Sequence, residues 1–151
     1  MRRNMRRIPK PTDERTPPMQ KYLAAYAASL VVMLALDLVW LTTVAKPMYV
    51  KSIGDLLADQ PNLPAALVFY VVFVLGVMLF AVTPHGATQD WRATLVSGAL
   101  FGFFTYATYE LTNLATLRNW PIGISLLDMV WGSALSAVSA AAGKAVLDRM
   151  L

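Results

Sequence analysis

Four long stretches of the chain are almost entirely apolar, and polar segments separate them. They span residues 22–44, 63–83, 93–116 and 122–147. Each is about 20 residues or longer, which is the length that a helix needs to cross a hydrocarbon core roughly 30 Å thick. Strands of a membrane barrel would be about ten residues long and would alternate apolar with polar residues. The pattern therefore predicts an all-α membrane protein, with four transmembrane helices in one domain over residues 22–151.

The connections between the apolar stretches predict how the helices are arranged. The second and third connections, 84–92 and 117–121, are short, so consecutive helices should be antiparallel neighbours in an up-down-up-down bundle. The first connection, 45–62, is longer, and apolar residues beginning at Tyr49 recur in it at helical spacing. It predicts a short helix at the membrane surface. We favour a simple interfacial connector over the alternative, a lid above a site.

The first 21 residues are basic and rich in proline. The segment contains seven Lys or Arg residues but only two acidic residues, Asp13 and Glu14, and it contains four prolines. This composition predicts a disordered tail. Positive residues beside a first helix are retained in the cytoplasm, so the tail indicates a cytoplasmic N-terminus, and an even number of helices returns the C-terminus to the same side. Contact with anionic lipid headgroups is the alternative role of the tail.

Composition and motifs exclude several function classes. The absence of cysteine removes disulfides, thiolate nucleophiles and Cys-ligated metals, and His85 is the only histidine. The pI near 9.6 comes largely from the tail, and no nucleic-acid reader motif accompanies it. Nucleotide-binding glycine loops, nucleophile elbows and zinc motifs are also missing. We therefore expect membrane lipids as partners, no nucleic-acid partner, and no metal or cofactor, and we favour a non-enzymatic role over a conventional enzyme.

Three carboxylic acids interrupt the apolar stretches. Asp37, Glu110 and Asp128 lie within runs that contain no Lys or Arg to neutralise them, and the last of these runs ends at Gly143, just before Lys144. An ionised side chain at the centre of a membrane helix costs about 2.5 to 3.5 kcal/mol on insertion scales. Intramembrane acids of this kind mark functional sites by default. The sequence therefore predicts a polar site within the membrane.

Helix rise places these acids at one depth. At about 1.5 Å per residue, Asp37 lies roughly 22 Å from the cytoplasmic end of its helix and Glu110 roughly 25 Å from the corresponding end of the third helix. Asp128 lies roughly 9 Å below the outer end of the fourth helix, and Tyr70 is seven residues into the second. All four helices thus contribute a polar side chain to one layer in the outer half of the membrane.

Other polar and aromatic residues reinforce this layer. On the third helix, Tyr106, Tyr109, Glu110 and Asn113 follow i, i+3, i+4, i+7 spacing and share one face. Trp40 and Trp131 follow Asp37 and Asp128 at the same spacing, and could offer rings to a cation, although packing is the favoured role. The candidate binding or proton site therefore consists of Asp37, Trp40, Tyr70, Tyr106, Tyr109, Glu110, Asn113, Asp128 and Trp131.

Small residues predict where helices approach closely. Gly98 and Gly102 form a G-x-x-x-G pair in the third helix, and Gly132, Ser136 and Ala140 repeat the spacing in the fourth. Such stripes let membrane helices pack backbone to backbone. We expect packing within the chain, and the same pattern is compatible with a homodimer.

Several of these residues occur in strings that resemble a known family. The strings are Asp37-x-x-Trp40-Leu41, Tyr106-x-x-Tyr109-Glu110-Leu111-Thr112-Asn113-Leu114-Ala115-Thr116, Trp120-Pro121 and Asp128-x-x-Trp131-Gly132. Together they resemble the bacterial family catalogued as domain of unknown function 2177, over Tyr22 to the C-terminus. The family often has Asp where this chain has Glu110. The resemblance implies a small four-helix protein of the bacterial cytoplasmic membrane, and it carries no established activity.

The residues leave three interpretations open. The first is proton- or cation-linked binding or transport, with the three acids as exchangeable groups. The second is an accessory or scaffold role in membrane-lipid metabolism. The third is a structural subunit in which neutral acids form a hydrogen-bonded clasp between helices.

Overall fold

The computed structural model describes residues 18–86 and 90–150, and no strand occurs within them. Three helical stretches, Met19–Leu56, Leu63–His85 and Ile122–Met150, are long and apolar enough to cross a membrane. A fourth long helix, α4 (Trp91–Thr116), is roughly 39 Å long at the usual rise. The prediction of an all-α membrane protein is confirmed. Residues 1–17 of the predicted disordered tail lie outside the described part, whereas residues 18–21, predicted as the end of that tail, already belong to α1.

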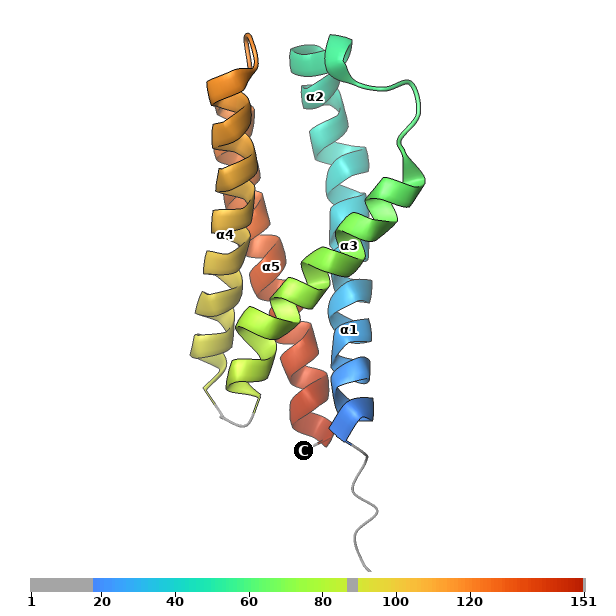
Figure 1. The fold of residues 1–151 in the computed structure, drawn as a ribbon, viewed down its shortest axis with the longest axis vertical. Coiled ribbons are helices and arrows are strands. Elements are labelled where there is room, and N and C mark those ends of the chain that lie inside the picture. The colour runs from blue at the N-terminus through green and yellow to red at the C-terminus, as the bar shows by residue number, and fades with distance from the viewer. Residues whose placement is uncertain (1–17, 87–89, 151) are drawn as a thin grey trace, which may run out of the picture.

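The first helix continues well beyond the expected end at residue 44. α1 (Pro18–Val39) passes through a π-helical segment (Trp40–Ala45) into α2 (Lys46–Ile53) and a short 3₁₀ turn (Gly54–Leu56). The segment expected to lie as a surface helix is thus largely a coaxial extension of α1 (Figure 1). In the π segment the N–H of Lys46 donates to the carbonyl of Leu41. This shift places Pro47 in the first turn of α2, where its missing N–H is tolerated.

The second helix, α3, crosses the bundle obliquely. α3 (Leu63–Val77) starts at Asn62, whose side chain accepts the N–H of Ala65 at 3.1 Å, and continues through a π segment (Met78–Val82) into a 3₁₀ turn (Thr83–His85). In Figure 1 it lies near α4 at its lower end and diverges from it toward the upper end. Helices α3 and α4 therefore form a wedge that widens toward α2.

Helices α4 and α5 (Ile122–Met150) run side by side in opposite directions (Figure 1). The Asp90 side chain caps α4 by accepting the N–H groups of Arg92 and Ala93 at 3.0 and 3.3 Å. Asn119 turns the chain between the two helices with φ 58°, a left-handed conformation that Asn tolerates better than most residues. The start of α1 and the end of α5 lie at the same end of the bundle (Figure 1).

Small residues set the contact between α4 and α5. A Cβ at Gly102 would collide with the carbonyl oxygen of Gly132 and with Oγ of Ser136, and a Cβ at Gly98 would lie 3.0 Å from Cβ of Ala140. Helix α5 also packs against α1, so it is the central element of the bundle. The core beside it contains Met33, Val74, Val77, Leu135 and Leu147, all at most 1% exposed.

Candidate functional site

Asp37 ties three helices together. Its side chain is 6% exposed, and both of its carboxyl oxygens accept hydrogen bonds from other elements. The Tyr70 hydroxyl of α3 donates to Oδ2 at 2.6 Å, and the Trp131 indole N–H of α5 donates to Oδ1 at 3.3 Å. Trp40 stacks on Trp131, with ring centroids 4.4 Å apart and planes 9° from parallel. Four predicted site residues thus form one clasp between α1, α3 and α5.

Glu110 is held by residues at the turn between α4 and α5. Its side chain is 1% exposed, and Oε2 accepts hydrogen bonds from the Trp120 indole at 2.8 Å and from the Ser125 hydroxyl at 2.6 Å. The Trp120 ring also meets Tyr109 edge to face, with centroids 6.2 Å apart. The second carboxylate oxygen, Oε1, makes neither of these bonds.

Asp128 is held by the extended first helix. The Tyr49 hydroxyl of α2 donates to its Oδ2. The Asp128 carboxyl also lies within hydrogen-bonding range of Glu110, and within electrostatic range of both Glu110 and Asp37. Two of the three acids therefore form a carboxyl pair between α4 and α5.

A cavity of about 400 Å³ opens beside this carboxyl pair, and we call it the acidic cavity. Glu110 and Asp128 line it, and none of the described residues in its wall is basic. Asp37 is not part of that wall, because its oxygens face Tyr70 and Trp131. The remaining lining residues are Tyr49, Phe69, Phe73, Thr105, Tyr106 and Tyr109.

The backbone explains why the cavity forms there. The oblique course of α3 separates its upper half from α4 (Figure 1), and aromatic side chains fill only part of the space. Gly132 leaves room for the ring of Tyr106, since a Cβ at that position would collide with it. The continuation of α1 into α2 brings Tyr49 over the carboxyl pair from a third direction.

The predicted residues therefore divide into two groups. Asp37, Trp40, Tyr70 and Trp131 build the clasp, whereas Tyr106, Tyr109, Glu110 and Asp128 line the acidic cavity. Asn113 belongs to neither, and its amide nitrogen is buried without a hydrogen-bond partner among the described residues. Within 18–86 and 90–150, no three acidic or histidine side chains could hold one metal ion.

Sequence reasoning missed several contributors to the site. Tyr49 was expected on a surface connector and Trp120 was not among the predicted site residues, but both donate hydrogen bonds to buried carboxyl oxygens. The spacing signal for Tyr49 was present, because it begins the apolar stripe of the first connection. Phe69 and Phe73 carry no polar signal that distinguishes them from lipid-facing residues.

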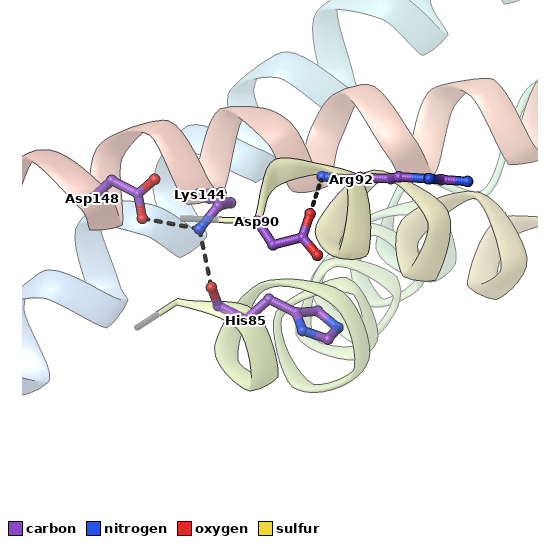
Figure 2. A network of polar contacts seen from close by, with 5 residues as sticks. All are labelled: His85, Asp90, Arg92, Lys144 and Asp148. Carbon is purple, nitrogen blue, oxygen red and sulfur yellow. Dashed lines mark hydrogen bonds and ion pairs between the residues drawn. The ribbon is translucent and has the colours of Figure 1, made fainter. Parts of the chain in front are cut away.

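A second polar cluster lies at the opposite end of the bundle (Figure 2). Lys144 of α5 is fully buried, and its Nζ donates to the backbone carbonyl of His85 at 3.0 Å and to Oδ1 of Asp148 at 3.1 Å. It also lies 5.6 Å from the centroid of the Trp91 ring. The His85 ring pairs with the Ser97 hydroxyl at 3.1 Å. These contacts join the end of α5 to both ends of the connection between α3 and α4.

Lys144→Met is expected to lower the free energy of unfolding by about 1–3 kcal/mol, because it removes the donor to a backbone carbonyl and to a partly buried carboxylate. The methionine keeps most of the buried stem, so packing changes little. Denaturation in mixed detergent micelles measures the effect. Arg149→Met, at an exposed position in the last turn of α5, is the control and should leave stability unchanged. Equal stability of the two variants would contradict a structural role for the cluster.

Comparison with known proteins identifies the family of the chain but no activity. No curated protein and no solved structure matches the chain. The family described as predicted membrane protein (DUF2177) matches residues 22–145, which include the clasp, the carboxyl pair and most of the Lys144 cluster. This range covers most of the sequence and the greater part of each of the four long helices. The chain therefore belongs to the DUF2177 family of predicted membrane proteins.

Proposed function

We propose that the protein binds a small organic cation in the acidic cavity and releases a proton when it does so. The observation that carries this proposal is the composition of the cavity wall. It combines two carboxyl groups with five aromatic rings and contains no basic residue among those described. A cavity of about 400 Å³ is large enough for a small molecule and falls in the size range of ligand sites.

The aromatic rings favour an ammonium group over a bare metal ion. Rings around a cation attract it through their negative faces, and aromatic cages recognise quaternary ammonium groups in this way. A metal ion would need several oxygen ligands at short range, and the described acids do not form such a group. An organic cation needs only nearby negative charge and polarisable walls.

The carboxyl pair supplies the link to protons. Two carboxyl groups in contact in a low-dielectric site cannot both be charged unless a cation neutralises them. In the empty site, Glu110 and Asp128 would therefore share at least one proton. An entering cation replaces that proton, so binding strengthens as pH rises and protons appear in solution.

The Asp37 clasp supports a separate structural role for the third acid. Each of its oxygens already accepts a hydrogen bond from a side chain of another helix. The clasp fixes the position of α3 relative to α1 and α5, and Tyr26 adds a second α1–α3 bond to the carbonyl of Val71 at 2.9 Å. In this proposal Asp37 shapes the cavity without touching its occupant.

The same proposal includes an orientation in the membrane. The basic residues of segment 1–21 precede α1, and positive residues beside a first helix favour the cytoplasmic side. Both ends of the chain would then be cytoplasmic, and the acidic cavity would lie toward the outer surface of a bacterial inner membrane.

Calorimetry of the full-length protein in detergent tests the proposal, with benzyltrimethylammonium as the probe. We expect saturable binding, accompanied by proton release that a pH indicator detects in weakly buffered solution. The neutral carbon isostere neopentylbenzene is the matched control and should bind far more weakly, because it gains nothing from the carboxyl pair. Equal binding of the two compounds, or cation binding without proton release, would refute the proposal.

A further inference from the structure

Two further cavities continue the acidic cavity along the bundle. One, of about 590 Å³, lies between α3 and α4, and Phe69 and Phe73 line both it and the acidic cavity. The other, of about 680 Å³, lies along α4, and Phe80 and Phe101 line both it and the second cavity. Thr105 lines all three. We call the second and third cavities together the lipid-facing groove.

The groove is apolar and open to the membrane. Its walls include Val72, Phe80 and Phe104, whose side chains are 60%, 63% and 62% exposed. At the base of the groove, the Phe101 ring packs against α3 at Gly76. A Cβ at Gly76 would collide with this ring, so the contact requires glycine. On α4 the residues that line the groove run from Ser97 to Thr108, a rise of roughly 17 Å, and Glu110 of the acidic cavity lies one half-turn beyond Thr108. The groove is therefore comparable in length to one hydrocarbon chain.

We infer that the ligand of the acidic cavity is an amphiphile that carries an ammonium head and one hydrocarbon chain. This inference rests on the proposed function and adds the class of ligand. The head neutralises Glu110 and Asp128, while the chain lies in the lipid-facing groove between α3 and α4. Such a ligand enters from the membrane through the open side of the wedge and needs no aqueous path.

The negative charge of the acidic cavity narrows the class of amphiphiles that could bind there. A phospholipid headgroup brings a phosphate next to its ammonium group. None of the described residues that line the acidic cavity is a Lys or Arg that could pair with phosphate, and the carboxyl pair would repel it. The ligand is therefore a long-chain ammonium compound without a phosphate.

Photolabelling of the full-length protein in lipid nanodiscs tests this inference. The probe is hexadecyltrimethylammonium with a diazirine in the chain, and hexadecanol with the same diazirine is the neutral control. We expect the cationic probe to label peptides of α3 and α4 along the groove several-fold more than other lipid-facing peptides. Saturating benzyltrimethylammonium should suppress that labelling. The neutral probe should label all lipid-facing helices evenly and resist competition.

A pair of variants separates the groove from the rest of the surface. Val72→Phe adds a ring inside the groove, whereas Val71→Phe adds one on the same helix at a residue that lines none of the three cavities. Only Val72→Phe should reduce groove labelling by the cationic probe, and both variants should still bind benzyltrimethylammonium, because neither residue lines the acidic cavity.

The outcomes distinguish the inference from the function on which it rests. Even labelling by the cationic probe, in protein that still binds benzyltrimethylammonium, would overturn the inference alone. Protection of the groove from both probes would also overturn it, since that result indicates a second copy of the chain over the groove. Equal groove labelling by a hexadecylphosphocholine photoprobe would overturn the exclusion of phosphate. If the unmodified protein does not bind benzyltrimethylammonium at all, the proposed function itself is wrong.

Discussion

Glu110→Gln is expected to weaken benzyltrimethylammonium binding by at least about thirty-fold, because removing one partner of a desolvated charge pair costs roughly 2 kcal/mol or more. Gln can still accept the hydrogen bonds that Trp120 and Ser125 donate to Oε2 of the acid. The change therefore removes a charge and an exchangeable proton with little change of shape. Calorimetry at one pH, with proton release recorded in parallel, measures both losses.

The control for this variant is another buried acid of the same layer. Asp37→Asn removes a carboxyl that is as buried as that of Asp128 but lies outside the cavity wall. The Asn oxygen can still accept the Tyr70 hydroxyl that holds α3 in place, so this variant should retain binding and proton release within a few-fold of the unmodified protein. Asp128→Asn, which removes the other cavity acid, should behave like Glu110→Gln. If Asp37→Asn abolishes binding while both cavity variants retain it, the assignment of the carboxyl pair as the binding site is wrong.

The fold was largely predictable because a membrane imposes simple constraints. Apolar runs of sufficient length must form helices, and short connections make successive helices neighbours. The end of the first helix was not predictable in the same way. Pro47 normally marks a helix boundary, but the π segment before it shifts the hydrogen-bonding pattern by one residue and lets the helix continue to Leu56.

The sequence predicts the three acids of the candidate site, but it does not predict which of them line the cavity and which belongs to the clasp. The insertion cost of a carboxyl group singles out Asp37, Glu110 and Asp128 from sequence alone. Which acid is satisfied by neighbours, and which faces a cavity, depends on the angle at which α3 crosses the bundle. That angle follows from contacts distant in sequence, such as Tyr70 with Asp37 and Phe101 with Gly76. Helix periodicity carries no information about such pairs.

The clasp and the cavity are therefore parts of one arrangement. The Tyr70–Asp37 bond holds the upper half of α3 against α1, on the side away from α4. This position keeps the wedge between α3 and α4 open beside the carboxyl pair. In the function that we propose, one costly acid therefore fixes a helix and the two others attract a ligand.

Gly102→Ala is expected to lower the free energy of unfolding by about 3 kcal/mol, the upper end of the usual cost of overpacking, because the atoms that it meets belong to backbone. The new methyl group would collide with the carbonyl oxygen of Gly132, which cannot turn aside as a flexible side chain can. Relief requires α4 and α5 to separate, and that movement also displaces Tyr106 from its place over Gly132. Denaturation in mixed micelles measures the loss.

Gly123→Ala is the matched control for Gly102→Ala, since it makes the same chemical change in a helix of the same pair. A Cβ at Gly123 meets nothing within 4 Å. Alanine also favours helix over glycine by roughly 0.5–1 kcal/mol in a helix interior, so near the start of α5 this variant should be neutral or slightly more stable. The contrast between the two variants isolates the close approach of α4 and α5 from helix propensity. Equal stabilities would mean that the two helices are farther apart in the membrane than the glycine contacts require.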